Sequence, residues 1–141
     1  MSYRFELVTD IKTLEEQNKF IRQGILSFND SFMGGIPEQY SVYLKDESGK
    51  IIGGAIVYAY ISSIYVDVIW IEENYREKGL GTKLLNHVEA EALKRNIVVS
   101  TLDTFSFQAE QFYLKKGYKH LGTIKNYLNG HDRIYLRKEL A

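Results

Sequence analysis

The chain has 141 residues, of which 45% are apolar and 26% charged, and this length and composition fit one globular domain over residues 1–141. Its 18 basic residues balance 18 acidic ones, so it lacks the basic surface that nucleic-acid binding requires. Without cysteine, a signal-like N-terminus or a membrane-length apolar run, we expect a cytoplasmic protein with no disulfides and no membrane partner.

The N-terminal third predicts a strand and then a helix. Residues 3–8 alternate between polar and apolar side chains, which is typical of a strand. Thr9 or Asp10 can cap a helix over about 11–23, and Gly24 is expected to end it. The segment that follows, as far as the single proline, predicts a short helix and a loop.

Three strands are expected next. Residues 39–46 alternate, the turn sequence ESGK follows them, and residues 51–62 return as a longer strand. Residues 63–71 carry apolar side chains at both odd and even positions, so this strand should lie in the centre of the sheet.

The second half begins with a helix over 79–95, whose apolar residues are spaced to form a single buried stripe. A buried strand over 97–102 and a short helix over 107–116 follow. Two last strands are expected over 118–128 and 133–140.

This order of elements predicts the fold class. The strand over 64–71, the helix after it and the strand over 97–102 form a βαβ unit, in which the two strands are parallel. Short turns join the flanking strands, so those should be antiparallel. We therefore expect an α/β (mixed α+β) fold with a mixed, mostly antiparallel sheet of about six to seven strands and helices on both faces.

Two glycines, Gly79 and Gly81, stand where a helix is expected to begin. The first backbone N–H groups of a helix have no partner within it and bind anions well. Glycine leaves room for a phosphate to approach, and Arg76, Lys78 and Lys83 add positive charge at the rim. The stretch predicts a pyrophosphate cradle, although a plain strand-to-helix turn would also use such glycines.

Other phosphate-binding motifs fit less well. A Walker A loop fails on the sequence GLGTKL, and a Rossmann fingerprint would need a glycine where Leu84 stands. Asp103, at the end of the next strand, lies where a ribose-binding acid could be. However, the single βαβ unit and the strands before it are not what a dinucleotide-binding fold predicts.

The stretch from Arg76 to Gly81 matches R-x-x-G-x-G, the acetyl-CoA motif of the GNAT N-acetyltransferase superfamily. The segment SFQAEQFYLKKGYK resembles the second signature of that family. Its marked positions are occupied here by Ala109, Phe112, Tyr113 and Gly117, whereas Ser106 replaces asparagine and Tyr118 replaces phenylalanine. The resemblance extends over nearly the whole chain and implies a single GNAT domain that transfers an acetyl group from acetyl-CoA to an amine.

The resemblance implies that pantetheine runs beside residues 69–71, where the strand separates from its parallel neighbour, and that acetyl-CoA is a cosubstrate, with no metal. It assigns to acetyl-CoA binding Ile69, Trp70, Ile71, Arg76, Glu77, Lys78, Gly79, Leu80, Gly81, Thr82, Ser106 and Phe112.

For the chemistry, the resemblance implies that Tyr113 is the general acid that protonates the departing thiolate. A backbone N–H at or near Ile71 is the expected donor to the developing oxyanion. Asp67 lies inside an apolar strand, where burial would raise the pKa of its carboxyl, and is the first candidate for general base. Glu72, Glu73 and a water relay without any single base are the alternatives.

The acceptor is expected to be an amine of a small molecule or peptide, with Phe28, Phe32 and Tyr127 among its contacts; for the phenylalanines a core position is an equal alternative. The resemblance allows a homodimer. Two other classes of protein stay open: a CoA-binding or sensing module without turnover, and another nucleotide-binding protein that uses the same glycine loop.

Overall fold

The computed structural model describes all 141 residues as two units, Met1–Gly35 and Ile36–Ala141, and each is described by itself. The first unit contains one helix, α1 (Ile11–Met33). The expected cap is confirmed, since the Asp10 carboxylate accepts hydrogen bonds from the Thr13 backbone N–H at 3.0 Å and from the Thr13 hydroxyl at 2.7 Å. No residue of α1 is buried.

Two sequence predictions in this unit are wrong. Residues 3–8 form no strand, because alternation specifies a strand only where a neighbouring strand supplies hydrogen-bond partners. The helix also continues through Gly24 as far as Met33, where only a short helix and a loop were expected. A glycine inside a helix costs only about 1 kcal/mol of stability, so the helix can continue through Gly24. It ends at Gly34, which adopts the left-handed conformation (φ 70°) that is common just after a helix.

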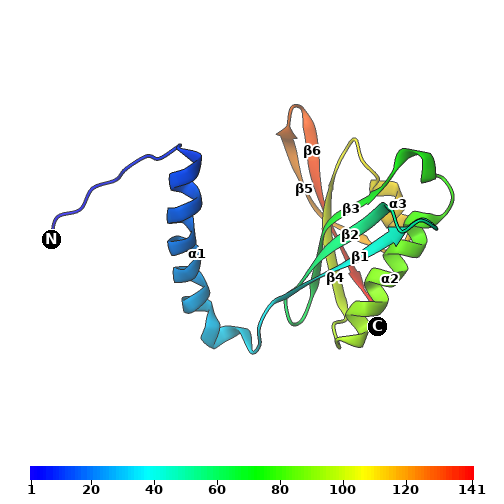
Figure 1. Ribbon diagram of the computed structural model, residues 1–141, viewed down its shortest axis with the longest axis horizontal. Coiled ribbons are helices and arrows are strands. Elements are labelled where there is room, and N and C mark those ends of the chain that lie inside the picture. Colours follow the sequence, from blue (N-terminus) through cyan, green and yellow to red (C-terminus); the bar gives the residue numbers. More distant parts are fainter. The chain divides into compact units, whose positions relative to one another are not determined.

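The second unit is built on one six-stranded sheet, in the spatial order β1-β2-β3-β4-β6-β5 (Figure 1). Only β3 and β4 are parallel, which confirms the predicted βαβ unit. The strands are β1 (Glu38–Lys45), β2 (Ile51–Ala59), β3 (Ile64–Ile71), β4 (Val99–Phe105), β5 (Lys119–Leu128) and β6 (His131–Glu139).

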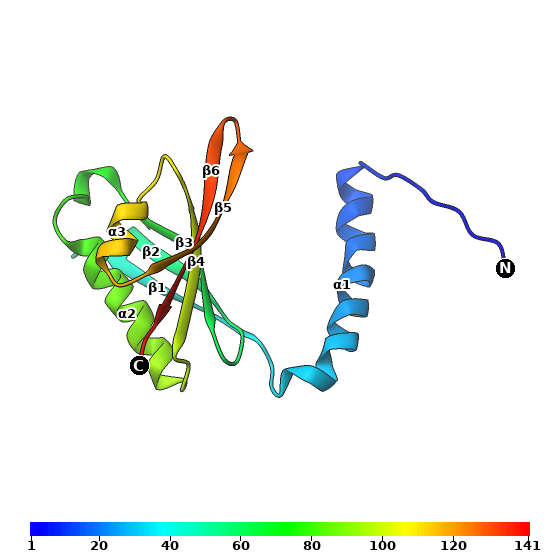
Figure 2. The same cartoon turned by 180° about the vertical axis from the view of Figure 1, so that it is seen from behind.

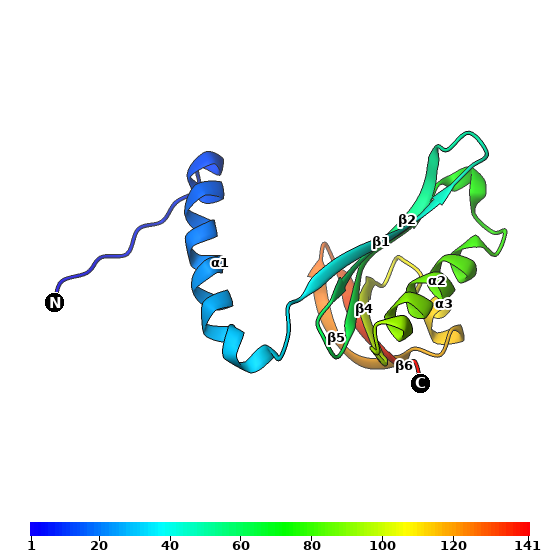
Figure 3. The same cartoon turned by 60° about the horizontal axis from the view of Figure 1, so that its bottom comes forward.

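Both helices of this unit, α2 (Leu80–Lys94) and α3 (Glu110–Lys115), cover the same face of the sheet (Figures 2 and 3). The predicted stripe of α2 is buried there at Leu84, Leu85, Val88 and Ala92. They pack against inward residues of the strands, among them Val57, Ile64 and Leu136. The sequence also predicted a helix on the opposite face of the sheet. That stays a prediction, because the third helix, α1, lies in the first unit, which is described by itself.

A β-bulge at Asp67 changes which side chains of β3 share a face. Val57 pairs with Val66, but Ile56 pairs with Val68, so Asp67 is an extra residue without a partner. Simple alternation along an uninterrupted strand would place Tyr65, Asp67, Ile69 and Ile71 on one face. The bulge instead turns Ile69 and Ile71 to the helix-covered side, where they pack on the core, while Tyr65 lies on the open side.

The two parallel strands stay together over a short distance only. β3 and β4 pair at three positions, the last being Val66 with Leu102, yet β3 runs on to Ile71 and β4 to Phe105. Beyond this point, which we call the fork, the strands separate. The separation expected from the family resemblance is therefore present.

Candidate active site

The fork opens into a groove of about 810 Å³. Its walls come from four segments: the second half of β3, the loop and first turn of α2, the end of β4, and α3. The two stretches singled out from the sequence, around Gly79–Gly81 and around Phe112–Tyr113, thus meet in one cavity although they are about 30 residues apart in the chain.

The start of α2 offers free backbone donors to this groove. Gly79 is the N-cap, has a left-handed conformation (φ 77°) and has no side chain that could cap the helix. The first intrahelical hydrogen bond runs from Lys83 N–H to Gly79 C=O at 3.3 Å. The N–H groups of Leu80, Gly81 and Thr82 therefore have no helical partner, and all three residues line the groove, which suits an anionic ligand.

The backbone of β3 also presents free groups at the fork. Glu72 N–H donates to Ile52 C=O on β2 at 2.8 Å. Backbone groups alternate in direction along an antiparallel strand, so Ile69 and Ile71 direct theirs away from β2 and toward the groove. An extended ligand with amide groups could bind there as an additional strand.

Arg76 has a different contact from the one expected. Its Nε donates to Ile71 C=O at 2.8 Å, across the loop that joins β3 to α2. In this structure the side chain therefore braces the loop, although the guanidinium also lines the groove and its other donors are free for a phosphate. One of the two exposed β3 carbonyls is occupied by this contact.

Tyr113 projects from α3 into the groove. The residue is 6% exposed, and burial raises the pKa of its phenol to about 12. Burial is the cause of that shift, and no hydrogen bond within the protein engages the hydroxyl. The side chain thus combines a firmly held proton with a hydroxyl that is free to bond a ligand.

Asp67 also lines the groove, but it is exposed at the bulge. The sequence argument that burial tunes its carboxyl is therefore wrong, because the extra residue turns the side chain out of the packed strand. Glu73 is exposed, and Glu72 forms an ion pair with Lys50 at 3.8 Å. Asp67 is the carboxylate among these three that borders the groove.

The remaining expected site residues are divided. Trp70, Glu77 and Phe112 line the groove. Ser106 does not; its hydroxyl accepts from Asp132 N–H at 3.0 Å and ties the β4–α3 loop to β6. Phe28 and Phe32 lie on α1, with ring centroids 5.9 Å apart, in the first unit.

Sequence reasoning missed a polar cluster beside the fork. The Asp103 carboxylate accepts hydrogen bonds from Arg133 Nε at 2.9 Å, from Arg133 Nη2 at 3.0 Å and from the Tyr65 hydroxyl. Arg133 Nη1 donates to the Tyr127 hydroxyl at 2.7 Å. The available signal was one acidic residue inside an apolar strand, which asks for a partner; nothing in the sequence identified Arg133 and Tyr65 as that partner.

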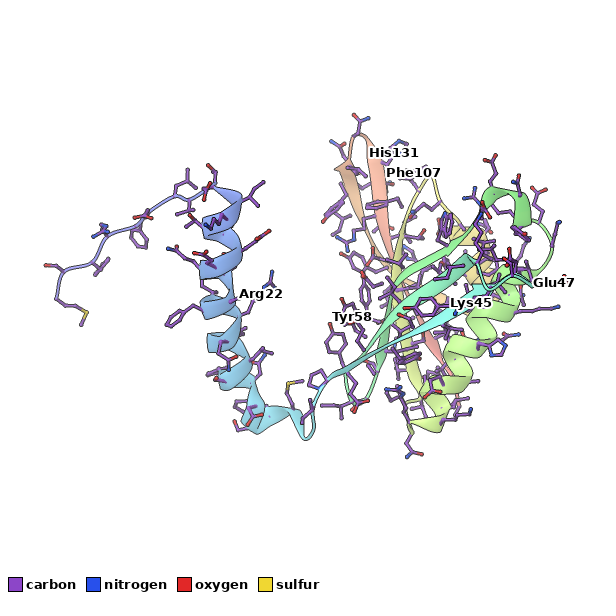
Figure 4. All side chains as sticks on the ribbon, viewed as in Figure 1. Arg22, Lys45, Glu47, Tyr58, Phe107 and His131 are labelled. Atoms are coloured by element: carbon purple, nitrogen blue, oxygen red, sulfur yellow. The ribbon has the colours of Figure 1, made fainter.

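Aromatic rings continue from this cluster to the β5–β6 hairpin. Phe105 stacks between Phe107 and Tyr127, with centroid distances of 5.5 Å and 6.0 Å. His131 meets Phe107 edge-on at 4.7 Å, and Figure 4 shows this pair at the tip of the hairpin. Tyr127, expected at the acceptor site, is thus held in a row of rings that begins at the groove-lining Phe105.

Comparison with known proteins identifies the family to which the chain belongs. Residues 38–120 match the acetyltransferase (GNAT) domain. The chain is 33% identical over 104 residues to blasticidin-S acetyltransferase of Streptomyces morookaense, covering 73% of this chain and 76% of the relative. It is 24% identical over 124 residues to an acetyltransferase of Agrobacterium fabrum, covering 87% and 90%. A crystal structure of a Bacillus cereus acetyltransferase superposes with a TM-score of 0.85 at 30% identity, over 97% of each chain.

The chain belongs to the GNAT acetyltransferase family. It is an acetyl-CoA-dependent N-acetyltransferase, as the two sequence signatures predicted. None of its helices is both long and apolar enough to cross a membrane.

Proposed function

We propose that the protein transfers the acetyl group from acetyl-CoA to a primary amine of a small molecule or of a peptide, by direct attack of the amine on the bound thioester. One observation carries the proposal: the uncapped start of α2, the free backbone of β3 and the Tyr113 hydroxyl all border one groove. The uncapped helix start suits the phosphates, the free strand backbone suits pantetheine, and the hydroxyl suits the leaving-group sulfur.

Binding rests on the backbone. The N–H groups of Leu80, Gly81 and Thr82 bind the diphosphate, supported by the positive end of α2, and Arg76 and Lys78 supply charge at the rim. Ile69 and Ile71 bind the amides of pantetheine. Phe112 closes the groove behind Gly81, where a Cβ built on the glycine would lie 3.4 Å from its ring.

Tyr113 supplies the proton for the leaving group. As the amine nitrogen forms its bond to the carbonyl carbon, the C–S bond breaks and the thiolate takes the phenolic proton. The amine nitrogen gives up one proton, which returns to the phenolate through water, so no net proton is consumed. A backbone N–H of β3 that pantetheine does not engage donates to the carbonyl oxygen while negative charge develops there.

Asp67 is the proposed proton acceptor on the amine side, acting through water. This carboxylate borders the groove at the fork, and its exposure allows water to connect it to the acceptor. Because the amine must be neutral to attack, a carboxylate that removes a proton from the ammonium form helps most below the pKa of the amine.

The experiment is release of free thiol from acetyl-CoA in the presence of a panel of amines: blasticidin S, an aminoglycoside, spermidine and a peptide with a free N-terminus. Blasticidin S is included because a relative bears its name. Amine-dependent thiol release supports the proposal. A protein that binds CoA, as seen by a raised melting temperature, but acetylates none of these amines would be a CoA-binding module.

A further inference from the structure

We propose that Tyr65 and Asp103 form the acceptor side of the catalytic groove, where the Tyr65 oxygen and the Asp103 carboxylate accept hydrogen bonds from the amine nitrogen. The inference rests on the proposed function and adds to it the residues that orient the nucleophile.

Tyr65 and Asp103 lie at the point where the two parallel strands separate. Strand pairing ends where Val66 meets Leu102; Tyr65 comes one residue before that point on β3 and Asp103 one residue after it on β4. Their side chains bridge the two strands on the face opposite to α2. Asp103 lines the groove and its side chain is 10% exposed. Through its hydrogen bond to Asp103, the Tyr65 hydroxyl lies next to the groove wall.

The hydrogen bonds within the cluster leave acceptor atoms free. The Tyr65 hydroxyl donates a hydrogen bond to Asp103, and Arg133 donates from Nε and Nη2 to the same carboxylate and from Nη1 to the Tyr127 hydroxyl. The Tyr65 O–H and three of the five Arg133 N–H groups are thus committed within the cluster, while lone pairs remain on the Tyr65 oxygen and on Asp103 Oδ1, which accepts a single hydrogen bond. The cluster therefore offers acceptors to the groove, which suits an N–H group.

The cluster has no net charge, which bears on the protonation of a bound amine. The positive charge of Arg133 balances the negative charge of Asp103, so their ion pair adds no net charge to the site. A lone carboxylate at this position would hold the acceptor as its ammonium ion, which cannot attack. A neutral site can bind an amine N–H without stabilising the protonated form. Tyr65 and Asp103 thus orient the nucleophile, whereas the extra proton of the ammonium form leaves through water toward Asp67.

The test uses two probes that need no knowledge of the natural acceptor. Both are CoA thioethers: one carries an S-linked acetic acid butylamide and the other the matching butyl ester. They place either N–H or oxygen where the amine nitrogen would be. Calorimetry on the wild-type protein should give about five- to tenfold tighter binding of the amide, which is the contribution of one hydrogen bond.

Tyr65→Phe should reduce this preference to within about twofold and leave the affinity for CoA itself unchanged. Asp103→Asn is the second variant, since it keeps the shape of the side chain and changes the acceptor. The matched control is Tyr58→Phe, which makes the same chemical change at the residue paired with Tyr65 on the neighbouring strand. Figure 4 shows Tyr58 on the side of the sheet away from α2.

Equal binding of amide and ester by the wild-type protein would overturn the inference, and so would a preference that survives in both Tyr65→Phe and Asp103→Asn. Either result leaves acetyl transfer itself intact. Failure of the proposed function looks different, because no amine of the panel would then release thiol from acetyl-CoA, whatever the binding of the two probes.

Discussion

The ring of Phe112 on α3 lies directly against Gly81 in the first turn of α2. A Cβ built on Gly81 would be 3.4 Å from Phe112 Cζ and 3.7 Å from Ile71 Cδ1. The two signature segments of the chain therefore touch at the bottom of the groove. This contact leaves the other side of Gly81 for a ligand, and several consequences can be measured.

Gly81→Asp should abolish CoA binding without loss of stability. The new carboxylate places negative charge beside the N–H groups that bind the diphosphate and repels it, so the Kd for CoA should rise at least about 100-fold. The folded protein should keep its melting temperature, because aspartate is favourable in the first turn of a helix and glycine is not. Calorimetry and thermal unfolding report the two quantities.

Gly122→Asp is the control for that variant, since a Cβ there meets nothing within 4 Å and the residue lies on β5 away from the groove. Equal CoA affinity of Gly81→Asp and wild type would contradict the placement of the diphosphate.

Tyr113→Phe should lower kcat by about 100-fold, the size of one general-acid contribution, with less than a twofold change in the Kd for acetyl-CoA. Tyr43→Phe, on the exposed side of β1, should change neither. An unaltered kcat in Tyr113→Phe would assign the protonation of the thiolate to another group, such as water.

Alkaline pH should destabilise the protein in a defined window. Burial raises the pKa of Tyr113 and of Tyr40 to about 12, from 10.0 in the unfolded chain. A raised folded-state pKa contributes stability that is fully present below pH 10 and is lost as the pH rises toward 12, because only the unfolded state ionises in that interval. Urea unfolding at pH 8, 10 and 11.5 tests this; a flat stability over the range would argue against buried phenols.

A buried network under α2 should show strong coupling. The Tyr118 hydroxyl hydrogen-bonds Ser100 at 2.7 Å and Glu89 at 2.9 Å, and Lys138 Nζ donates to Glu89 at 2.7 Å. Lys138→Met leaves a buried carboxylate without its cation, which typically costs about 3–5 kcal/mol of unfolding free energy. Adding Glu89→Gln should restore about half, and simple additivity of the two changes in urea unfolding would disprove the coupling.

Asp67→Asn tests the base. The variant should lower kcat/KM about tenfold at pH 7 and much less at a pH above the pKa of the amine, where the acceptor is already neutral. The same loss at every pH would mean that Asp67 only shapes the groove.

Local chemistry explains which parts of this architecture the sequence could predict. Periodicity predicted α2 and its buried stripe, and the βαβ rule predicted that β3 and β4 are parallel. The bulge at Asp67 could not be predicted, because one extra residue changes register without any distinctive residue type. The end of α1 was missed for a similar reason: Gly24 and Gly34 look alike in sequence, and only Gly34 is left-handed.

The candidate site divides in the same way. Backbone features marked by glycine were visible at Gly79 and Gly81, since a missing side chain is itself a sequence signal. The cluster of Tyr65, Asp103 and Arg133 was not, because its three members come from three strands and meet only when the sheet order is known.

The central claim is that the backbone N–H groups at the start of α2 bind the diphosphate of CoA. Its most direct test is amide chemical-shift mapping by NMR with two ligands: CoA, and pantetheine, which has no diphosphate. The account predicts that CoA shifts the amide signals of residues 77–82 strongly and that pantetheine leaves them in place while moving those of Ile69 and Ile71. Unchanged signals for residues 77–82 at saturating CoA would contradict it.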